Sequence, residues 1–565
     1  MPTAVLSRAR VADLLPREWA DASWDDLLFG SKAEVEATDG DALTLSVTPD
    51  RLDLLSEGGL GLALQGMVGA AVGLPRPAHP PPTDPVPTIR ADASVVPLRP
   101  EVAGVVLRAP GEVGLDAGLL AEAIRFQELL HATIGRDRRA ASLGIYPLDR
   151  ATPPIRYALE PVADVRFVPL DGADELPAAR FFAEHPLAAR YGAFGRAGDR
   201  CLVLRDAAGS VLSLPPVLNS RTAGEARVGD RTLLLESTGV RARSVAESLG
   251  LLMLPFVARG WSVGPVRVEG PGPDPRDGRA ILEPHTVELP AALVRAVAGT
   301  PLSAAEVAHR LARSRLGAHP SGDGWTVAAP PWRPDLVTPI DAVEDVVLIA
   351  GVKASDGIVP PSRTRGRRLP EIRLRRRLAT ALLGLGFAQP NSPLLLSTAT
   401  VALVGGDPPI PLTNPVSAEY AFVRDRLLPS HLDILGRNTR RGYPQRFAEV
   451  GPVVVRDRDA ESGGATRYHA IAVLAADSAG FADAAGVVEY LLRDLDVGSV
   501  REPAELSASI PGRAARVRVA GGAVAEIGEV HPRILTALGV PVPVAWAEVD
   551  VTALEPVLGG RDTGK

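Results

Sequence analysis

A run of prolines, LPRPAHPPPTDPVP at residues 74–87, constrains this chain more than any other local feature. Proline fixes φ and lacks an amide hydrogen, so a stretch this dense is stiff and extended and cannot lie inside a helix or a central strand. A second break, EGPGPDPRDGR, follows at residues 269–279. The 565 residues exceed the length that one core usually organises. We therefore expect several domains, each with its own core.

Between these breaks, the mixture of helix-like and strand-like segments predicts an α+β multidomain fold. No short repeat of fixed period is visible, so a solenoid is not expected. We predict an N-terminal α+β domain at 1–75, a proline-rich linker at 76–90, a central α/β domain at 91–270, a small helix–strand domain at 280–355 and a C-terminal domain with an antiparallel sheet at 360–565.

Local patterns place several elements within these domains. DALTLSV alternates as a half-buried strand does, with Leu43, Leu45 and Val47 on one face. AEAIRFQELLHATIG is typical of an amphipathic helix that ends at Gly135 as its C-cap. Ser303 and Glu306 have the spacing of a capping box at a helix start. Further segments predict a buried strand in RTLLLESTG, a helix in SVAESLGLLMLPFVARGW, and strands in FAEVGPVVV, AIAVLAA, ARVRVAG and VAWAEVDV.

Composition limits the class of protein. The net charge of −6 argues against a dedicated high-affinity nucleic-acid binder but allows local basic surface. Cys201 is the single cysteine, which excludes an internal disulfide and a cysteine-based zinc site. The longest apolar run, residues 249–258, contains a proline and is too short to span a bilayer, so no membrane association is expected. No secretory signal is visible in the first twenty residues, and we expect a cytoplasmic protein.

The segment PPWRPDLVTPIDAVEDVVLIAGV, residues 330–352, carries the most specific chemistry. In a helix beginning near Pro339, Asp341, Glu344 and Asp345 share one face, and Asp335 lies on the approach to it. Four oxygen donors of this kind suit Mg²⁺. A simpler interpretation is that acids in a first helical turn complement the helix dipole, and the spacing alone favours that interpretation.

This segment resembles the signature of phenylalanyl-tRNA synthetase β subunits of the archaeal/eukaryotic type, in which Arg-x-Asp-(Ile/Leu) precedes a helix written Asp-x-Val-Glu-Asp/Glu. The resemblance implies that Asp335, Asp341, Glu344 and Asp345 bind Mg²⁺ at a site shared with an α subunit. It continues, in the family's order, through these further segments: KAEVE, TPDRLDLLSEGGLGLAL, FQELLHATIGRDRRAASLGIYPLD, LSLPPVLNS, LLLESTG, LTNPVSAEYAFVRDRLLPSHLDILGRNTRRGYPQRFAEVG and GEVHP.

The resemblance implies a role for each domain. The central domain would be an editing domain, the helix–strand domain would be winged-helix-like, and the C-terminal domain would resemble a class II synthetase core that has lost its active site. We find no Gly-x-Gly-x-x-x-Arg run of the kind used around ATP. ATP and phenylalanine are therefore expected on α, in an α2β2 heterotetramer that charges tRNA(Phe).

Two groups of arginines are candidates for contacts with partners. For Arg424, Arg426, Arg437, Arg440 and Arg441, phosphate binding is possible in principle, but a helix face at the α–β interface is the favoured interpretation. The run RTRGRRLPEIRLRRR, residues 363–377, holds eight arginines that could follow a tRNA backbone, or could equally be a solvated linker and helix face. No aromatic residue is interleaved, so base stacking is not predicted there.

Editing has a physical rationale in this family. An apolar pocket cannot strongly reject a ligand that only adds a hydroxyl, so a second site that hydrogen-bonds the tyrosine hydroxyl and hydrolyses mischarged tyrosyl-tRNA improves discrimination. For each editing candidate taken singly a structural role, such as capping a turn, is the simpler interpretation. The candidates in the matched segments are His131, Tyr146, Asn219, Ser220, Glu236 and Thr238.

Two departures from the family pattern leave other functions open. Pro147 stands where an aspartate is common, and Arg221 follows PPVLNS where a small or acidic residue is usual. Either could weaken hydrolysis. The alternatives are a diverged paralogue that works as a free-standing deacylase, and a non-catalytic scaffold. The intact resemblance of residues 335–345 and 412–451 speaks against the free-standing deacylase.

Overall fold

The computed structural model describes residues 1–20, 24–77, 86–271, 278–299, 301–349 and 364–558. Residues 78–85 of the proline-rich linker and Arg363, the first arginine of the basic run, lie outside this description. By the contacts between residues, the chain divides into two compact units, residues 1–358 and 359–565. Several sheets and many helices share each unit, so the expected mixed, multidomain character of the fold is confirmed.

The first unit begins with a small antiparallel sheet in the order β1-β3-β2. Its middle strand is the one predicted by alternation, and Leu43, Leu45 and Val47 are all buried. The strands are β1 Thr3–Ser7, β2 Ala33–Asp39 and β3 Ala42–Val47; the helices around them are α1 Arg8–Ala12, α2 Arg17–Ala20, α3 Asp25–Gly30 and α4 Glu57–Met67.

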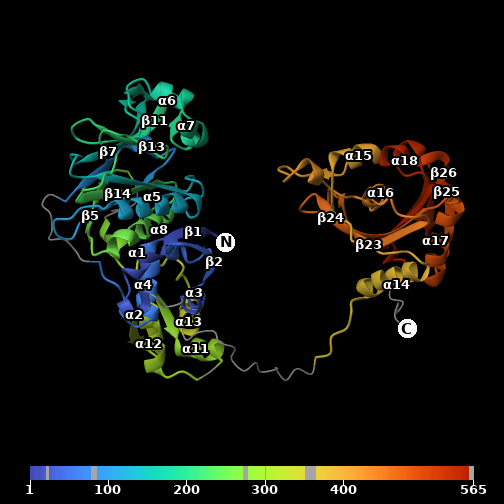
Figure 1. Cartoon of the computed structure of the whole chain (residues 1–565), viewed down its shortest axis with the longest axis horizontal. Helices are drawn as coiled ribbons and strands as arrows, with labels where there is room; N and C mark the ends of the chain where they lie inside the picture. Colours follow the sequence, from blue (N-terminus) through green and yellow to red (C-terminus); the bar gives the residue numbers. More distant parts are fainter. Residues whose placement is uncertain (21–23, 78–85, 272–277, 300, 350–363, 559–565) are drawn as a thin grey trace. The chain divides into compact units, whose positions relative to one another are not determined.

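Two further sheets lie face to face in the middle of this unit. One has the order β15-β5-β14-β6 and is antiparallel throughout; helices α5 and α8 cover its outer face (Figure 1). Its elements are β5 Glu101–Arg108, α5 Ala117–Ala132, β6 Ala141–Pro147, β14 Thr232–Gly239, α8 Ala242–Leu252, α9 Leu254–Val257 and β15 Ser262–Pro265.

The second of these sheets runs β13-β12-β11-β7-β4-β16, with β10 beside β11. A core that includes Val106, Leu234, Tyr157 and Leu202 fills the space between the two sheets. The elements are β4 Thr88–Ala91, β7 Ile155–Pro161, β8 Arg166–Phe167, β9 Leu176–Pro177, α6 Ala178–Glu184, α7 Pro186–Tyr191, β10 Arg196–Ala197, β11 Arg200–Arg205, β12 Val211–Leu214, β13 Leu218–Asn219, β16 Arg267–Glu269 and α10 Gly278–Leu282.

Strand β14 connects these two cores because successive side chains of a strand point to opposite faces. Leu233 and Leu235 pack with the helices, whereas Leu234 packs between the sheets. Glu236, two residues after Leu234, therefore points into the space between the sheets. The predicted strand RTLLLESTG is confirmed, and its alternation gives the first unit a buried acid between two sheets.

Two helix predictions need correction. Helix α5 ends at Ala132 rather than at Gly135, because the Thr133 hydroxyl donates to the carbonyl of Leu129 and closes the last turn. The positive φ values follow instead at Arg136, Asp137 and Arg138. The second predicted helix, residues 244–261, is divided into α8 and α9 with a break at Met253, where Pro255 starts the new helix.

A three-stranded antiparallel sheet, β17-β19-β18, ends the first unit together with three helices. The Ser303 hydroxyl accepts the amide of Glu306, as the capping pattern predicted, and α13 begins at Pro339 as expected. The elements are β17 His285–Pro290, α11 Ala291–Ala298, α12 Ala304–Arg313, β18 Gly317–Ser321, β19 Gly324–Ala329 and α13 Pro339–Leu348.

The second unit is built on a six-stranded sheet, β23-β24-β28-β27-β26-β25, in which every pair is antiparallel, as predicted. Its strands are β23 Gln445–Arg456, β24 Gly464–Ala475, β25 Val500–Pro503, β26 Ser509–Val519, β27 Gly522–Val530 and β28 Val544–Asp550. A small sheet adds β20 Leu395–Leu396, β21 Ile410–Pro411 and β22 Phe422–Val423.

Helices cover both faces of the six-stranded sheet (Figure 1). One face packs against α14 Pro370–Gly384, α17 Phe481–Asp494 and α19 Val551–Leu554, and the other against α15 Thr398–Val404, α16 Leu428–Arg437 and α18 Pro532–Leu538.

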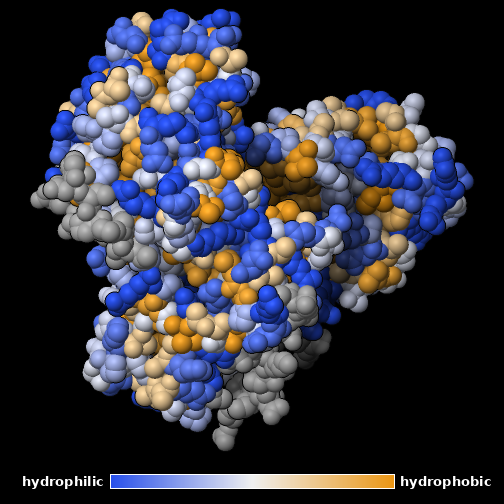
Figure 2. All heavy atoms as spheres, turned by 60° about the vertical axis from the view of Figure 1, so that its left-hand side comes forward, coloured by the Kyte–Doolittle hydropathy of each residue, from blue (hydrophilic) through white to orange (hydrophobic). Residues whose placement is uncertain are grey.

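The visible surface is largely hydrophilic, with apolar residues in smaller groups (Figure 2). Within the described residues, no helix combines the length and the apolar character that crossing a membrane requires.

Candidate functional site

A cavity of about 330 Å³ opens between α5 and the two central sheets. Its walls are mostly apolar and include Leu143 and Ile145 on β6, Leu214 at the end of β12 and Val217 beyond it. Four of the predicted editing residues line it: His131, Tyr146, Asn219 and Glu236. A cavity with apolar walls and a few polar groups is typical of a small-molecule site.

The floor of the cavity is a short chain of hydrogen bonds. The Tyr146 hydroxyl donates to Oε2 of Glu236 over 3.1 Å and lies 2.9 Å from the Ser213 hydroxyl, which is therefore the donor to Tyr146. Glu236 is buried, and its Oε1 makes no hydrogen bond within the described part of the chain. Burial raises the pKa of Glu236 to about 8, so this carboxyl is protonated at neutral pH and can donate a hydrogen bond.

The floor depends on the absence of a side chain at Gly144. A Cβ there would lie 2.2 Å from the Tyr146 hydroxyl oxygen, which no contact between heavy atoms of this kind allows. Gly144 and Tyr146 are two residues apart on β6, so they face the same side of the sheet. Glycine at 144 therefore lets the tyrosine ring lie along the strand toward Glu236.

His131 and Arg138 form one wall. The Leu143 amide donates to Nε2 of His131 over 2.9 Å, so the proton of the neutral ring is on Nδ1, which lies 3.1 Å from Glu128. Burial lowers the pKa of His131, which favours this neutral form. The Arg138 guanidinium holds both oxygens of Glu128, at 2.9 and 3.0 Å. These contacts at both nitrogens fix the orientation of the His131 ring as well as its tautomer.

Arg138 also holds the opposite rim. Its Nη1 donates to the carbonyls of Pro216 and Val217 over 3.0 and 2.9 Å, and its guanidinium lies 4.5 Å from the centre of the Tyr191 ring. The backbone of Arg138 has a φ of 64°, which is uncommon for a residue with a side chain. Sequence reasoning missed this residue, although it lies in the matched segment at 126–149.

The remaining editing candidates have structural partners. Ser220 is fully buried; its hydroxyl donates to the Val211 carbonyl and accepts the amides of Ala223 and Gly224. Thr238 accepts Nε of Arg99 and is not among the residues that line the cavity. Ser220 thus fixes the backbone beside the cavity, and Thr238 bonds a buried arginine; neither side chain lines the cavity.

The editing candidate Asn219 lines the cavity, whereas the two departures from the family pattern, Pro147 and Arg221, lie outside its lining. Asn219 lines the cavity and donates to the Gly224 carbonyl over 3.1 Å. Pro147 ends β6, and Arg221 is exposed and donates to the Gly172 carbonyl over 2.7 Å. Neither Pro147 nor Arg221 is among the described residues that line the cavity.

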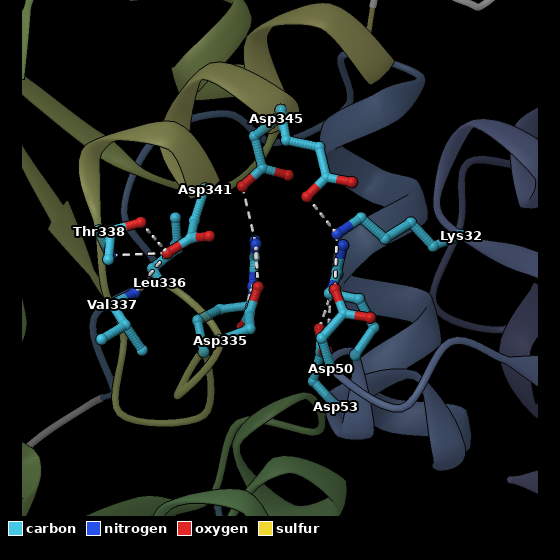
Figure 3. A network of polar contacts seen from close by, with 12 residues as sticks. Lys32, Asp50, Asp53, Asp335, Leu336, Val337, Thr338, Asp341 and Asp345 are labelled. Carbon is cyan, nitrogen blue, oxygen red and sulfur yellow. Dashed lines mark hydrogen bonds and ion pairs between the residues drawn. The ribbon is translucent and has the colours of Figure 1, made fainter. Parts of the chain in front are cut away.

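The acids of the 330–352 segment form a second polar cluster (Figure 3). Arg333 donates from Nη2 to Asp335 over 2.8 Å and to Asp345 over 2.7 Å, and its Nε lies 2.9 Å from Asp335. All three side chains are at most 8% exposed. Burial alone would raise the pKa of Asp335, but the charge of Arg333 outweighs it and lowers that pKa.

The two other acids face different partners. Nζ of Lys32 lies 2.7 Å from Glu344 and 2.6 Å from Asp50 (Figure 3). Asp341 accepts the Thr338 amide over 2.6 Å and the Thr338 hydroxyl over 2.9 Å, and so caps α13. Asp341 thus has a structural role in the first turn of α13, as the simpler interpretation of the spacing expected, although it acts through capping hydrogen bonds.

The structure thus brings Asp335 and Asp345 together on one arginine but does not gather the four predicted metal ligands around one point. In the described ranges, no group of three or more His, Cys, Asp or Glu side chains is arranged so that it could hold a metal ion. As they stand, these side chains do not fit a preformed Mg²⁺ site, and magnesium ligation by them stays a prediction.

The arginines of the second unit are mostly engaged within it. Arg424 is buried and bonds the carboxylate of Glu449 over 2.9 Å, so it does not lie on an exposed helix face, and a phosphate there would compete with that carboxylate. In α14, Arg377 pairs with Asp494 at 2.8 Å, and Arg375 lies over the Tyr468 ring. Sequence reasoning could not separate these internal arginines from exposed ones.

Comparison with known proteins identifies relatives over nearly the whole chain. Residues 287–352 match the family model of the tRNA synthetase B5 domain, and residues 357–551 match that of the phenylalanyl tRNA synthetase beta chain CLM domain. The chain is 30% identical to the phenylalanine–tRNA ligase β subunit of Korarchaeum cryptofilum, with 97% of this chain and 98% of that protein covered. The β subunit of Halorubrum lacusprofundi is 32% identical, with 98% and 100% covered.

A solved structure extends the comparison to the fold. An N-terminal fragment of the phenylalanyl-tRNA synthetase β subunit from Pyrococcus horikoshii superimposes with a TM-score of 0.55 at 24% identity. The match covers 62% of this chain and 99% of the fragment. At this identity the likeness concerns the fold alone.

Proposed function

The chain belongs to the phenylalanine–tRNA ligase β-subunit family, and from that premise we propose that it is the β subunit of an α2β2 enzyme that charges tRNA(Phe) with phenylalanine. It is thus a subunit of an aminoacyl-tRNA ligase, whose ATP-dependent step takes place on α. The near-complete coverage of relatives that are 30% and 32% identical carries this proposal.

The contacts within the second unit support a division of labour between the two subunits. Its antiparallel sheet with helices on both faces suits a class II synthetase-like core, but its buried arginine, Arg424, is committed to Glu449 and Ser392. A phosphate would have to displace these partners. We therefore assign this unit to assembly with α, and assign ATP and phenylalanine to the α subunit.

The cavity under α5 suits hydrolysis of mischarged tyrosyl-tRNA. Its apolar walls would take the ring, and the protonated carboxyl of Glu236 would hydrogen-bond the phenol hydroxyl, which phenylalanine lacks. In the reaction, water attacks the ester carbonyl carbon, the bond between that carbon and the ribose oxygen breaks, and the ribose oxygen takes a proton. Tyrosine and uncharged tRNA leave.

Contacts with tRNA are expected from arginines that the fold leaves exposed. Arg365, Arg367 and Arg368 precede α14 and are exposed, while Arg375 and Arg377 make internal contacts. Backbone contacts of this kind weaken steeply with salt. Magnesium is not assigned a step, because a cation at Asp335 or Glu344 would have to displace Arg333 or Lys32.

Two assays test the proposal. Purified alone, the chain should show no phenylalanine-dependent exchange of pyrophosphate into ATP, and mixing it with α should produce exchange and charging. Exchange by the isolated chain would refute the division of labour. Tyrosyl-tRNA should lose its tyrosine when the α–β complex is present.

The same deacylation assay separates the alternatives. Turnover by the isolated chain, with no effect of α, would indicate a free-standing deacylase. No turnover with or without α, in a complex that still charges tRNA, would indicate a scaffold. The Glu236→Met variant is the matched probe, because methionine is close to glutamate in size but cannot donate a hydrogen bond to the phenol hydroxyl, so deacylation of tyrosyl-tRNA should fall.

A further inference from the structure

We propose that in this chain the positive charge opposite the acids of residues 335–345 is supplied by Lys32 and Arg333 rather than by a divalent metal. The Arg333 ion pairs then hold the turn before α13 within the β17–α13 domain, residues 285–349, and the Lys32–Glu344 pair fastens that domain to the N-terminal domain, residues 1–73. These contacts hold the first unit together whether or not the central cavity edits.

Arg333 takes the place that a cation would need between two of the acids. It reaches Asp335 through Nε and Nη2 and reaches Asp345 through Nη2, with all contacts between 2.7 and 3.2 Å. Arginine keeps its charge at any working pH, and its planar group matches carboxylates. Mg²⁺ needs oxygens at about 2.0–2.1 Å in near-octahedral geometry. It could take these oxygens only if a side chain that is 5% exposed gave up its partners.

Lys32 supplies the second charge from a different domain. It follows α3, 312 positions before Glu344 in sequence, and its amino group bridges Glu344 and Asp50. Its φ is 69°, a backbone region that residues with side chains rarely adopt. Its side chain is 13% exposed. A lysine held in this conformation between two carboxylates is a fixed part of the junction.

A second N-terminal ion pair lies beside Arg333. Arg51 and Asp53 are bonded through both nitrogens at 2.8 Å and are both nearly buried. The charge of Arg51 acts on Asp335, and that of Asp53 acts on Arg333. The two arginines repel each other, and the carboxylates of Asp53 and Asp335 oppose that repulsion from both sides of the junction.

Backbone contacts show that the two domains are in close contact beside this network. The Gly73 amide donates to the Ala312 carbonyl over 2.6 Å, and Arg313 donates to the Met67 carbonyl. A Cβ at Gly66 would lie 2.1 Å from the Arg313 carbonyl oxygen, so the chains approach as closely as glycine permits. The Lys32–Glu344 ion pair thus joins surfaces that are already packed.

Titration with magnesium chloride tests the metal. The full-length chain, alone and in complex with α, should show no saturable binding of magnesium that Glu344→Gln or Asp345→Asn removes. Binding that both variants leave unchanged arises elsewhere and agrees with the proposal. Saturable binding by the wild-type chain that either variant removes would overturn it.

Acetylation tests the ion pair directly, because the chain has few lysines and a peptide map can follow Lys32 alone. We expect acetic anhydride to modify Lys32 about tenfold more slowly in the native chain than in the urea-unfolded chain, since modification needs local opening of the ion pair. In the Glu344→Gln chain, Lys32 should be acetylated several-fold faster than in the native wild-type chain. Added magnesium or chelator should leave the acetylation rate of Lys32 unchanged.

Glu306→Gln is the matched control, because Glu306 is a similarly exposed acid of the same domain that pairs with Arg310 instead of Lys32. It should leave the rate of Lys32 acetylation at the wild-type value. Equal acetylation of Lys32 in the wild-type and Glu344→Gln chains, with both folded by circular dichroism, would sink the proposal. A slowing of acetylation by magnesium withdrawal or a rise on its addition would also contradict it.

Discussion

The Tyr146 hydroxyl donates a hydrogen bond to Oε2 of Glu236 across 3.1 Å, at the floor of a cavity between two sheets. One residue comes from β6 and the other from β14, and the two strands are neighbours in one sheet. Their side chains meet because both face the second sheet. The polar floor is therefore a product of strand pairing, and several measurements can examine it.

Tyr146→Phe removes the hydroxyl that joins Glu236 to Ser213. Both partners stay buried, so we expect the free energy of unfolding to fall by about 1–3 kcal/mol. Urea unfolding of the wild-type and variant chains measures this change. Deacylation of tyrosyl-tRNA by the α–β complex should fall as well, while charging with phenylalanine continues. An unchanged unfolding midpoint would mean that the hydrogen bonds at the floor contribute little.

Glu236 makes stability depend on pH. Its pKa is about 8 in the folded chain, against an ordinary value of 4.5, so the folded state holds the proton more tightly than the unfolded state. Below pH 4.5 both states are protonated and the group has no effect. As pH rises from 4.5 to about 8 the unfolded state alone loses its proton, and stability falls by up to about 1.4 kcal/mol per pH unit.

Glu236→Gln isolates this contribution, since glutamine does not titrate. Relative to the wild type, the variant should gain stability progressively between pH 5 and pH 8 in urea unfolding of the first unit. Glu122, whose pKa burial raises to about 7, adds a similar slope that both chains share and that cancels in the difference. Parallel pH profiles for the two chains would contradict a raised pKa at Glu236.

Gly144→Ala tests the room that the tyrosine needs. The added Cβ would overlap the Tyr146 hydroxyl, so the ring has to move away from Glu236 or the strand has to shift. We expect a loss of about 1–3 kcal/mol from overpacking in addition to the lost hydrogen bond. The double variant with Tyr146→Phe should recover part of this loss. Gly384→Ala, where a Cβ meets nothing within 4 Å, is the control.

Arg138→Ala removes the side chain that joins Glu128 to the carbonyls of Pro216 and Val217. We expect kcat/KM for tyrosyl-tRNA deacylation to fall by about 10- to 100-fold, because a wall of the cavity loses its support. Arg138→Lys should restore only part, since an ammonium group cannot make the same forked contacts. The exposed neighbour Arg139, changed to alanine, should retain full activity. Equal activity of all three variants would exclude a positioning role.

Arg424→Met tests the buried ion pair of the second unit. The change leaves the Glu449 carboxylate without its arginine in a site where the acid is 8% exposed. Breaking a buried pair from one side costs about 3–5 kcal/mol, so we expect the second unit to unfold at clearly lower urea concentration. The change should also weaken association with α in sedimentation experiments. Arg437→Met, at an exposed pair with Asp433, should change stability little.

Local sequence patterns predicted many of the strands and helices correctly. The alternation at Leu43, Leu45 and Val47 gave a strand with one buried face, and Pro339 marked the first turn of α13 as expected. The failures were at helix ends. Gly135 looked like a cap, but the Thr133 hydroxyl closes the helix earlier, and a hydroxyl that bonds its own backbone leaves no clear signal in sequence.

The sequence predicted several residues of the cavity and of the acidic cluster, but it could not predict which of them contact one another. Tyr146 and Glu236 lie in segments that the family pattern marks, but their contact depends on which strands become neighbours. The link between Lys32 and Glu344 spans 312 positions and follows no periodicity, so no local rule could propose it. Arg333 and Asp335 are two residues apart, so their contact could be expected from the sequence. The contact between Arg333 and Asp345 forms only because the chain turns into α13 between them.

The alternation along β14 sets a limit on how this chain can change over time. The side chains of Leu234 and Glu236 point into the space between the sheets, and those of Leu233 and Leu235 pack against the helices. Inserting or deleting one codon within this strand would exchange the two sets beyond that point, burying a carboxyl under α8 and pointing leucines at the cavity. Point substitutions can accumulate here, but changes of length have to be confined to the loops on either side.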